Sequence, residues 1–220
     1  MKNTKTIFFF IISGLLLFWS SAEAHQPNFA NKEARIEIFD PEVSQAFYGF
    51  LDNEPAIYSI NSDSPFQLYV GLLTPDLPNP RNNLMANIKD GEGKELSSLD
   101  GLNNFTWQRW YEEFAGDWYW KGPEFKKEVL AGKYTITVSN QNNNGPYILV
   151  VGELESFPIS QTPEMFSDLF KIKTEFFHKP WYSVFQNKIG KYIGIFLLMI
   201  ALISTGIIFL IKFIKNKRSA

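Results

Sequence analysis

The residue with the clearest chemical potential is His25, because it directly follows a pattern typical of signal-peptide cleavage sites. Ala22, Glu23 and Ala24 form the small-residue A-x-A pattern, so cleavage after Ala24 would make His25 the first residue of the mature chain. A free α-amino group and an imidazole on one residue can chelate a metal ion, and copper(II) favours such nitrogen ligands. Copper binding at His25 is therefore one hypothesis, although the only other histidine is the distant His178.

The second chemical feature is an aromatic block, FTWQRWYEEFAGDWYWKGPEF, at residues 105–125. Exposed aromatic faces beside carboxylates suit stacking on sugar rings, whereas buried aromatic rings would form the core of a β-sandwich. We expect most of these rings to belong to the core and two or three to line a groove. The block holds four of the six tryptophans of the chain, namely Trp107, Trp110, Trp118 and Trp120.

Carboxylates in and near this block raise two further hypotheses. Paired acids could serve glycoside hydrolysis, and grouped acids could bind calcium, but no spacing fixes their separation and no EF-hand loop is present. The chain also has no cysteine, no Gly-x-Ser-x-Gly elbow and no Gly-rich phosphate loop. The sequence therefore predicts that the protein is not an enzyme, with a glycan hydrolase as an alternative. The acids considered are Glu112, Glu113, Asp117 and Glu124 for hydrolysis, and Asp90, Glu92 and Asp117 for calcium.

The two ends of the chain indicate where these groups are displayed. Lys2 and Lys5 precede an apolar run of 13 residues at 7–19, which is the length of a signal-peptide core. Residues 192–211 form 20 residues without a charge, enough for a helix to cross a bilayer, and a basic cluster follows. Basic clusters stay in the cytoplasm. We expect a single-pass protein of the cell membrane, with its N-terminal domain in the periplasm or at the cell surface.

The segment between the two hydrophobic ends is acidic. Residues 25–190 carry 14 Lys+Arg against 22 Asp+Glu, which gives a formal charge near −8. Nucleic acid is a poor partner for such a surface.

The same segment has the periodicity of β-strands. Phe66, Leu68, Val70 and Leu72 alternate with other residues, which is the period of a half-buried strand. Shorter β-prone runs occur at 35–39 and 56–60. Residues 84–96 and 131–153 each predict a hairpin, the first around Asp90-Gly91 and the second around a polar loop.

Two short helices are expected between these strands. Residues 40–49 begin Asp-Pro-Glu and end in glycine, and residues 162–177 begin Thr-Pro-Glu; both openings are typical of helix starts. The second helix has an apolar stripe that would pack on the sheet or lie at the lipid surface.

Two resemblances accompany these patterns. The stretch EVLAGKYTITVSNQNNNGPYILVVGE resembles the closing strands of bacterial pre-peptidase C-terminal domains, which implies a jelly-roll β-sandwich. The whole layout is similar to a group of membrane-anchored bacterial proteins whose mature chains start with His-Gln-Pro, which implies an architecture and no reaction. The residues that carry the second likeness are His25-Gln26-Pro27, DPEVSQAFYG, PFQLYVGLLTPD, YWKGPEF and VGELESFP.

Together these observations predict a mainly β protein, a jelly-roll-like β-sandwich with two short helices and one C-terminal transmembrane helix. We expect it to act as a binding or interaction module for an envelope protein or glycan, through the region of residues 107–125, with copper binding at His25 as the alternative. The expected organisation is a signal peptide at 1–24, a sandwich at 25–158, an amphipathic helix and linker at 159–190, a transmembrane helix at 191–211 and a cytoplasmic tail at 212–220.

Overall fold

The computed structural model describes residues 25–30, 35–103, 105–112, 116–156 and 162–186, together with 194–195, 197–206, 208–209 and 216. The predicted signal peptide at 1–24 lies outside these residues, as do most of the basic tail and parts of the predicted span at 191–211. None of the helices in the described ranges is long and apolar enough to cross a membrane.

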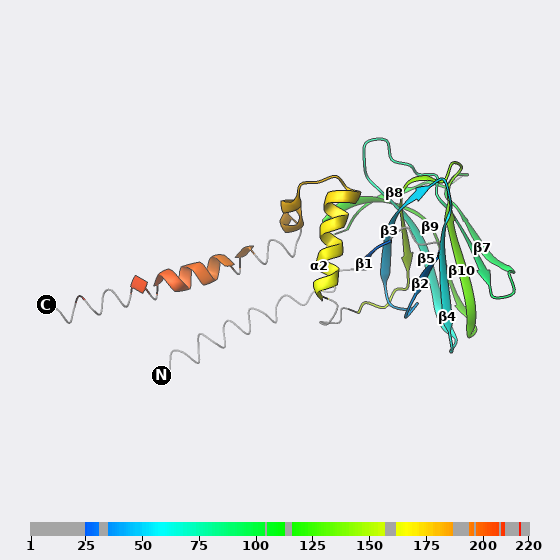
Figure 1. The fold of residues 1–220 in the computed structure, drawn as a ribbon, viewed down its shortest axis with the longest axis horizontal. Coiled ribbons are helices and arrows are strands. Elements are labelled where there is room, and N and C mark those ends of the chain that lie inside the picture. Colours follow the sequence, from blue (N-terminus) through cyan, green and yellow to red (C-terminus); the bar gives the residue numbers. More distant parts are fainter. Residues whose placement is uncertain are drawn as a thin grey trace.

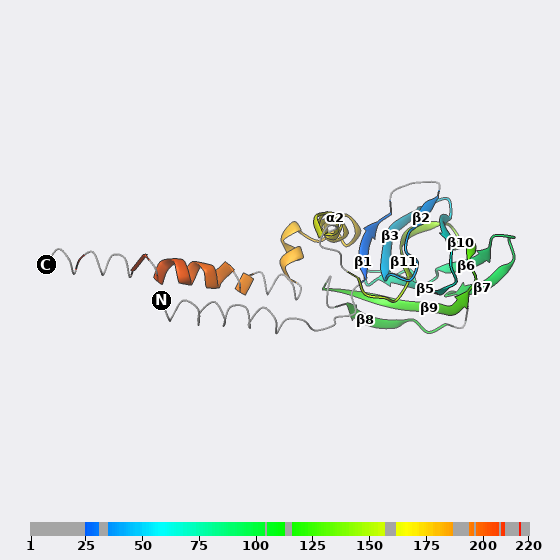
Figure 2. The ribbon, with the colours of Figure 1, turned by 90° about the horizontal axis from the view of Figure 1, so that it is seen from below.

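Eleven strands form two packed sheets, which makes the described part of the chain a mainly β two-sheet sandwich (Figures 1 and 2). The six-stranded sheet has the order β1-β3-β11-β5-β9-β8, and the five-stranded sheet has the order β2-β4-β10-β6-β7. The pairs β1–β3 and β2–β4 are parallel, whereas all other pairs are antiparallel. The bounds are β1 Gln26–Phe29, β2 Ile36–Ile38, β3 Gln45–Asp52, β4 Ala56–Ser62, β5 Phe66–Pro75, β6 Met85–Asp90, β7 Glu95–Asp100, β8 Gln108–Glu112, β9 Asp117–Val129, β10 Gly132–Ser139 and β11 Asn144–Val151.

The main core lies between the two sheets and is built by the predicted alternation. Phe66, Leu68, Val70 and Leu72 of β5 all point into it, as period-2 patterning requires. Inward residues of β10 and β11 complete it, including Ile136, Val138, Leu149 and Val151. The predicted two-sheet arrangement is therefore confirmed.

The prediction of a hairpin at 131–153 is wrong in its pairing. Both arms are strands, but β10 pairs with β4 and β6 in one sheet, while β11 pairs with β3 and β5 in the other. The polar loop between them crosses the sandwich, because each arm buries its apolar face from the opposite side of the core. The prediction of a hairpin at 84–96 is confirmed, since β6 and β7 pair antiparallel.

The predicted helix at 40–49 is also wrong. Asp40 adopts a positive φ of 50° in a turn, and the following residues enter β3. Phe47 of β3 faces the main core, while Ala46 and Tyr48 face a second core on the other side of the sheet. This segment forms a strand and not the helix that its capping pattern predicts. The reason is that a strand buried on both faces removes more apolar surface from water than a short surface helix does.

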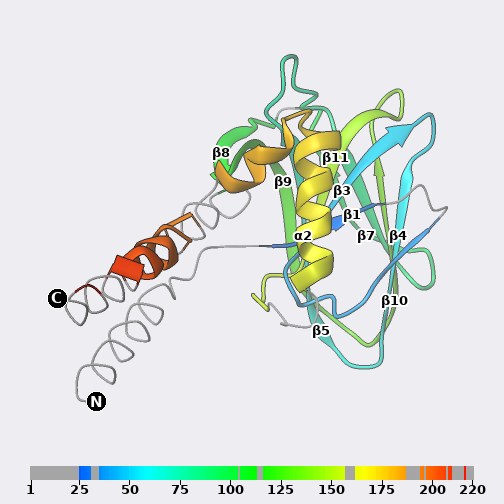
Figure 3. The same ribbon diagram turned by 60° about the vertical axis from the view of Figure 1, so that its left-hand side comes forward.

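The predicted helix at 162–177 is confirmed, as α2 (Thr162–Lys171) followed by the π-helical turn η2 (Ile172–Phe176). Its apolar stripe packs on the outer face of the six-stranded sheet, and Figure 3 shows α2 lying across that face. Of the two alternatives for the stripe, packing on the sheet is therefore the one that the structure shows. The second core combines Ile172, Phe176 and Phe177 with Tyr48, Leu73, Tyr119, Ile148 and Val150.

A short 3₁₀ helix, η3 (Trp181–Gln186), follows η2. The described residues at 194–195, 197–206 and 208–209 are helical as well (Figure 1). Helix α2, the turn η2 and the residues up to Lys179 lie on part of the six-stranded sheet, and we call them the helical layer. The part of that sheet that they leave uncovered carries the candidate site.

Candidate ligand-binding groove

A groove of about 510 Å³ opens on the outer face of the six-stranded sheet, beside the helical layer. Its floor comes from the neighbouring strands β11, β5 and β9, and its walls come from the segments just before β1 and β3 and just after β11. We call it the Tyr69 groove. It is lined by His25, Ser44, Tyr69, Gly71, Leu72, Leu73, Lys121, Gly122, Glu124, Lys126, Val150, Gly152, Glu153 and Glu155.

Two features of β5 leave space above the floor of the groove: Gly71 has no side chain, and the pairing of β5 with β9 changes register there. A side chain at Gly71 would place its Cβ only 3.1 Å from the Tyr69 hydroxyl, so glycine lets the phenol ring lean over the strand. The pairing of β5 with β9 also shifts between Gly71 and Leu73. Such irregularities re-aim side chains, and here they bring Lys121 and Glu124 to the same groove.

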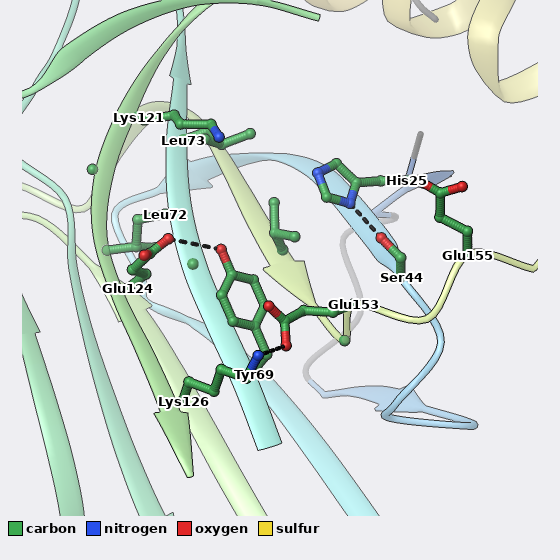
Figure 4. Close-up of a pocket in the computed structure, with 14 residues that line it drawn as sticks. His25, Ser44, Tyr69, Leu72, Leu73, Lys121, Glu124, Lys126, Glu153 and Glu155 are labelled. Atoms are coloured by element: carbon green, nitrogen blue, oxygen red, sulfur yellow. Dashed lines mark hydrogen bonds and ion pairs between the residues drawn. The ribbon is translucent and has the colours of Figure 1, made fainter. Parts of the chain in front are cut away.

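The polar groups of the groove are held by neighbours, as Figure 4 shows. The Tyr69 hydroxyl donates to Glu124 Oε2 at 2.9 Å, and Lys126 Nζ lies 2.6 Å from Glu153 Oε2. Lys121 Nζ sits 4.4 Å from the centre of the Trp110 ring, in a cation–π contact. These contacts orient the side chains before any ligand arrives, which lowers the entropy cost of binding.

His25 forms one end of the groove, and its ring is held through Nδ1, which lies 2.5 Å from the Ser44 hydroxyl oxygen. Burial, and to a smaller extent the nearby Lys121 ammonium, together lower the pKa of this imidazole to about 4. The ring is therefore neutral at pH 7. The groove then presents two lysines and three glutamates, with a nearly balanced charge.

The structure does not bring His178 to this groove. It lies exposed just after η2, with a positive φ of 53°, and is not among the residues that line the groove. Within the described ranges, no group of three or more histidines, cysteines, aspartates or glutamates is arranged to hold a metal ion. Copper binding at His25 stays a prediction.

The four predicted tryptophans of the aromatic block occupy three different environments. Trp107 is buried in the main core, where its Nε1 donates to the Gly101 carbonyl oxygen at 2.8 Å. Trp110 and Trp120 are half-buried, against the second core and the main core respectively. Trp118 is 43% exposed, and the Arg109 guanidinium covers one of its faces at 4.2 Å.

The predicted acidic set is divided by the fold. Glu124 lies in the Tyr69 groove, whereas Asp117 and Glu112 are buried neighbours on β9 and β8. Asp117 accepts from two lysines of the helical layer, Lys173 and Lys179. Asp90, from the predicted calcium set, lies at the end of β6 in the other sheet, where its carboxylate accepts backbone N–H groups in the β6–β7 turn. Glu113 lies outside the described residues.

Sequence reasoning missed most of the groove, including Tyr69, Ser44, Lys121, Lys126, Glu153 and Glu155. These residues come from segments far apart in the chain. All but Lys126 lie in the stretches DPEVSQAFYG, PFQLYVGLLTPD, YWKGPEF and VGELESFP, which the sequence linked to an architecture and not to a ligand. The one local signal was the alternation of β5, which places Tyr69 and Gly71 on the face opposite to the main core.

No protein-family model matches this chain, and no curated protein matches it. Among solved structures, it is similar to the pre-peptidase C-terminal domain of collagenase from Bacillus anthracis, with 12% identity and a TM-score of 0.32. That match covers 59% of this chain and 95% of that chain. It is also similar to CBM35 from Cellvibrio japonicus Abf62, with 14% identity and a TM-score of 0.28, over 48% of this chain and 74% of that one.

A third similar structure is a β-glucosidase from Paenibacillus barengoltzii, with 12% identity and a TM-score of 0.26, over 58% of this chain and 13% of that one. The first of the three belongs to the domain class that residues 128–153 resemble. All three are distant similarities.

Proposed function

We propose that this protein is a membrane-anchored binding module whose extracytoplasmic β-sandwich takes a neutral glycan in the Tyr69 groove. The observation that carries the proposal is a groove of about 510 Å³ whose charged side chains are largely held by neighbours and nearly balance in charge. This volume lies within the range of about 300–1,000 Å³ that is typical of small-molecule sites.

The lining favours a neutral, hydroxyl-rich ligand over an ion. An anion such as phosphate would face Glu124, Glu153 and Glu155, and a divalent cation would face Lys121 and Lys126. Sugar hydroxyls both donate and accept, so they can pair with carboxylates and ammonium groups in the same site. The Tyr69 ring, half-buried in the groove, supplies an apolar surface for a sugar ring.

The proposed anchoring rests on the C-terminal segment. Residues 192–211 carry no charge, and the large apolar side chains described within them are exposed in the structure. Apolar side chains that the rest of the protein does not bury are stabilised by contact with lipid chains. We place the sandwich outside the cytoplasm, since the A-x-A pattern before His25 is typical of a translocated chain.

The test measures binding of the full-length protein, held in lipid nanodiscs, to a panel of neutral mono- and disaccharides by calorimetry. Glu124→Gln removes a charged acceptor from the groove and should weaken binding by about 10-fold or more, since hydrogen bonds to charged groups contribute about 1.5–3 kcal/mol. The matched control is Glu128→Gln, an exposed glutamate of β9 that does not line the groove; it should bind like wild type. Absence of saccharide binding, or equal binding by Glu124→Gln and wild type, would contradict the proposal.

A further inference from the structure

Three aromatic side chains of η3 form an exposed apolar cluster close to the C-terminal segment. Trp181, Tyr182 and Phe185 are 60%, 50% and 51% exposed. The Trp181 ring contacts the other two, at centroid distances of 6.0 Å to Tyr182 and 6.4 Å to Phe185. Ser183 of the same helix is buried, so η3 packs through one side and turns its rings outward. Clustered exposed aromatics of this kind mark a surface that contacts a partner.

The position of the cluster in the chain identifies the partner as a lipid bilayer. Only residues 187–191 separate η3 from the uncharged stretch at 192–211, and five residues reach about 17 Å at most. Tryptophan and tyrosine concentrate at the membrane–water interface, where the ring is apolar and the N–H or O–H stays hydrated. We propose that Trp181, Tyr182 and Phe185 insert into the headgroup region of the outer leaflet and hold the sandwich against the membrane. We call these three residues the seat.

Two ion pairs to a buried carboxylate fix this seat to the sandwich. Lys173 of η2 and Lys179, two residues before η3, both contact the Asp117 carboxylate of β9, with Lys179 Nζ at 2.5 Å. The side chains of Lys173 and Asp117 are 1% and 0% exposed. The Lys179 N–H also donates to the Lys173 carbonyl oxygen at 2.8 Å, which ties the segment leading into η3 back to η2.

The consequence is a defined orientation of the protein on the membrane. Strand β9 carries Asp117 at its start and Lys121, Gly122, Glu124 and Lys126 of the Tyr69 groove farther along. One strand thus joins the seat to the groove, and Figures 1 and 3 show η3 on the side of the sandwich from which the C-terminal helix leaves. The seat therefore holds the groove at a fixed height above the bilayer. This inference rests on the membrane anchoring in the proposed function, and it does not depend on the identity of the ligand.

The experiment uses tryptophan fluorescence of the protein from His25 to Ala220, in phosphatidylcholine–phosphatidylglycerol nanodiscs that contain lipids brominated at shallow or deep acyl positions. Trp181 is the only tryptophan after residue 120, and the other four beyond residue 25 lie in the sandwich. We expect the shallow quencher to act more strongly than the deep one. Trp181→Phe keeps an aromatic ring and should lose at least two thirds of this quenching, whereas Trp118→Phe, the control on an exposed sandwich residue, should retain it.

Three outcomes would overturn the inference, and they point to different causes. No quenching in protein that co-purifies with nanodiscs would remove the seat and leave the anchoring intact. Equal quenching in wild type and Trp181→Phe would place another tryptophan at the membrane and would also reject the seat. Protein that does not co-purify with nanodiscs would refute the anchoring itself, while saccharide binding could still be measured in the free protein.

Discussion

At the scale of single residues, His25 is a side chain of the Tyr69 groove whose chemistry is changed by its surroundings. Its ring lies between the Tyr69 groove and a small hollow lined by Trp110 and Tyr119, and burial there disfavours the charged imidazolium. The neighbouring Lys121 adds a repulsion of the same sign. A neutral ring can accept a hydrogen bond from a ligand at the end of the groove.

The lowered pKa of His25 makes folding stability depend on pH. The pKa is about 4 in the folded protein and near 6.5 when unfolded, so the unfolded chain binds more protons between these values. The stabilisation is complete above pH 6.5 and is lost as pH falls towards 4, by at most about 3 kcal/mol. Urea unfolding at pH 7 and pH 4.5 should show a smaller drop in His25→Gln than in wild type. An NMR signal assigned to the His25 imidazole, by its loss in His25→Gln, that titrates near pH 6.5 would disprove this prediction.

At the scale of elements, one carboxylate adds ion pairs to the apolar contact between the helical layer and the six-stranded sheet. Asp117 meets Lys173 and Lys179, and Glu112 lies close enough to favour the charged form of Lys173, so the buried charges nearly balance. Burial lowers the pKa of Lys173, and the Asp117 carboxylate opposes that effect. Removing the Asp117 carboxylate would leave the Lys173 ammonium buried without its nearest counter-charge.

Asp117→Ala should therefore destabilise the protein by about 3–5 kcal/mol, which is the cost of breaking a buried ion pair. The matched control is Lys126→Ala, which breaks the half-exposed pair with Glu153 and should cost about 0–1 kcal/mol. Both values can be measured by urea unfolding of the full-length protein at pH 7. Losses of similar size in the two variants would show that Asp117 does not hold the helical layer.

At the scale of the whole molecule, the proposed topology predicts which parts of the chain a protease can reach. Intact-mass measurement of the protein isolated from membranes should give a chain that begins at His25. Protease added to right-side-out membrane vesicles should digest the sandwich, whereas an epitope fused after Ala220 should stay protected until the vesicles are opened. A retained N-terminal segment, or an epitope accessible from outside, would refute this topology.

The sequence predicted the elements whose pattern is local. Alternation identified the inward face of β5, because residues two apart share one face of any strand. The Thr162-Pro163-Glu164 opening and apolar stripe identified α2 for a similar reason, since capping and helical periodicity act within a few turns. The same opening failed at Asp40, where burial of β3 on both faces decided the conformation.

The sequence by itself determined the class of fold, through strand periodicity, and the expectation of a secreted, anchored chain, through its hydrophobic ends. Only the tertiary structure decided that β10 and β11 lie in different sheets, since their alternation fits either partner. The tertiary structure also brought His25, Tyr69, Glu124 and Glu153 into one groove. No local sequence pattern predicts that these residues lie together. Their proximity depends on which strands become neighbours and on which part of the sheet the helical layer leaves uncovered.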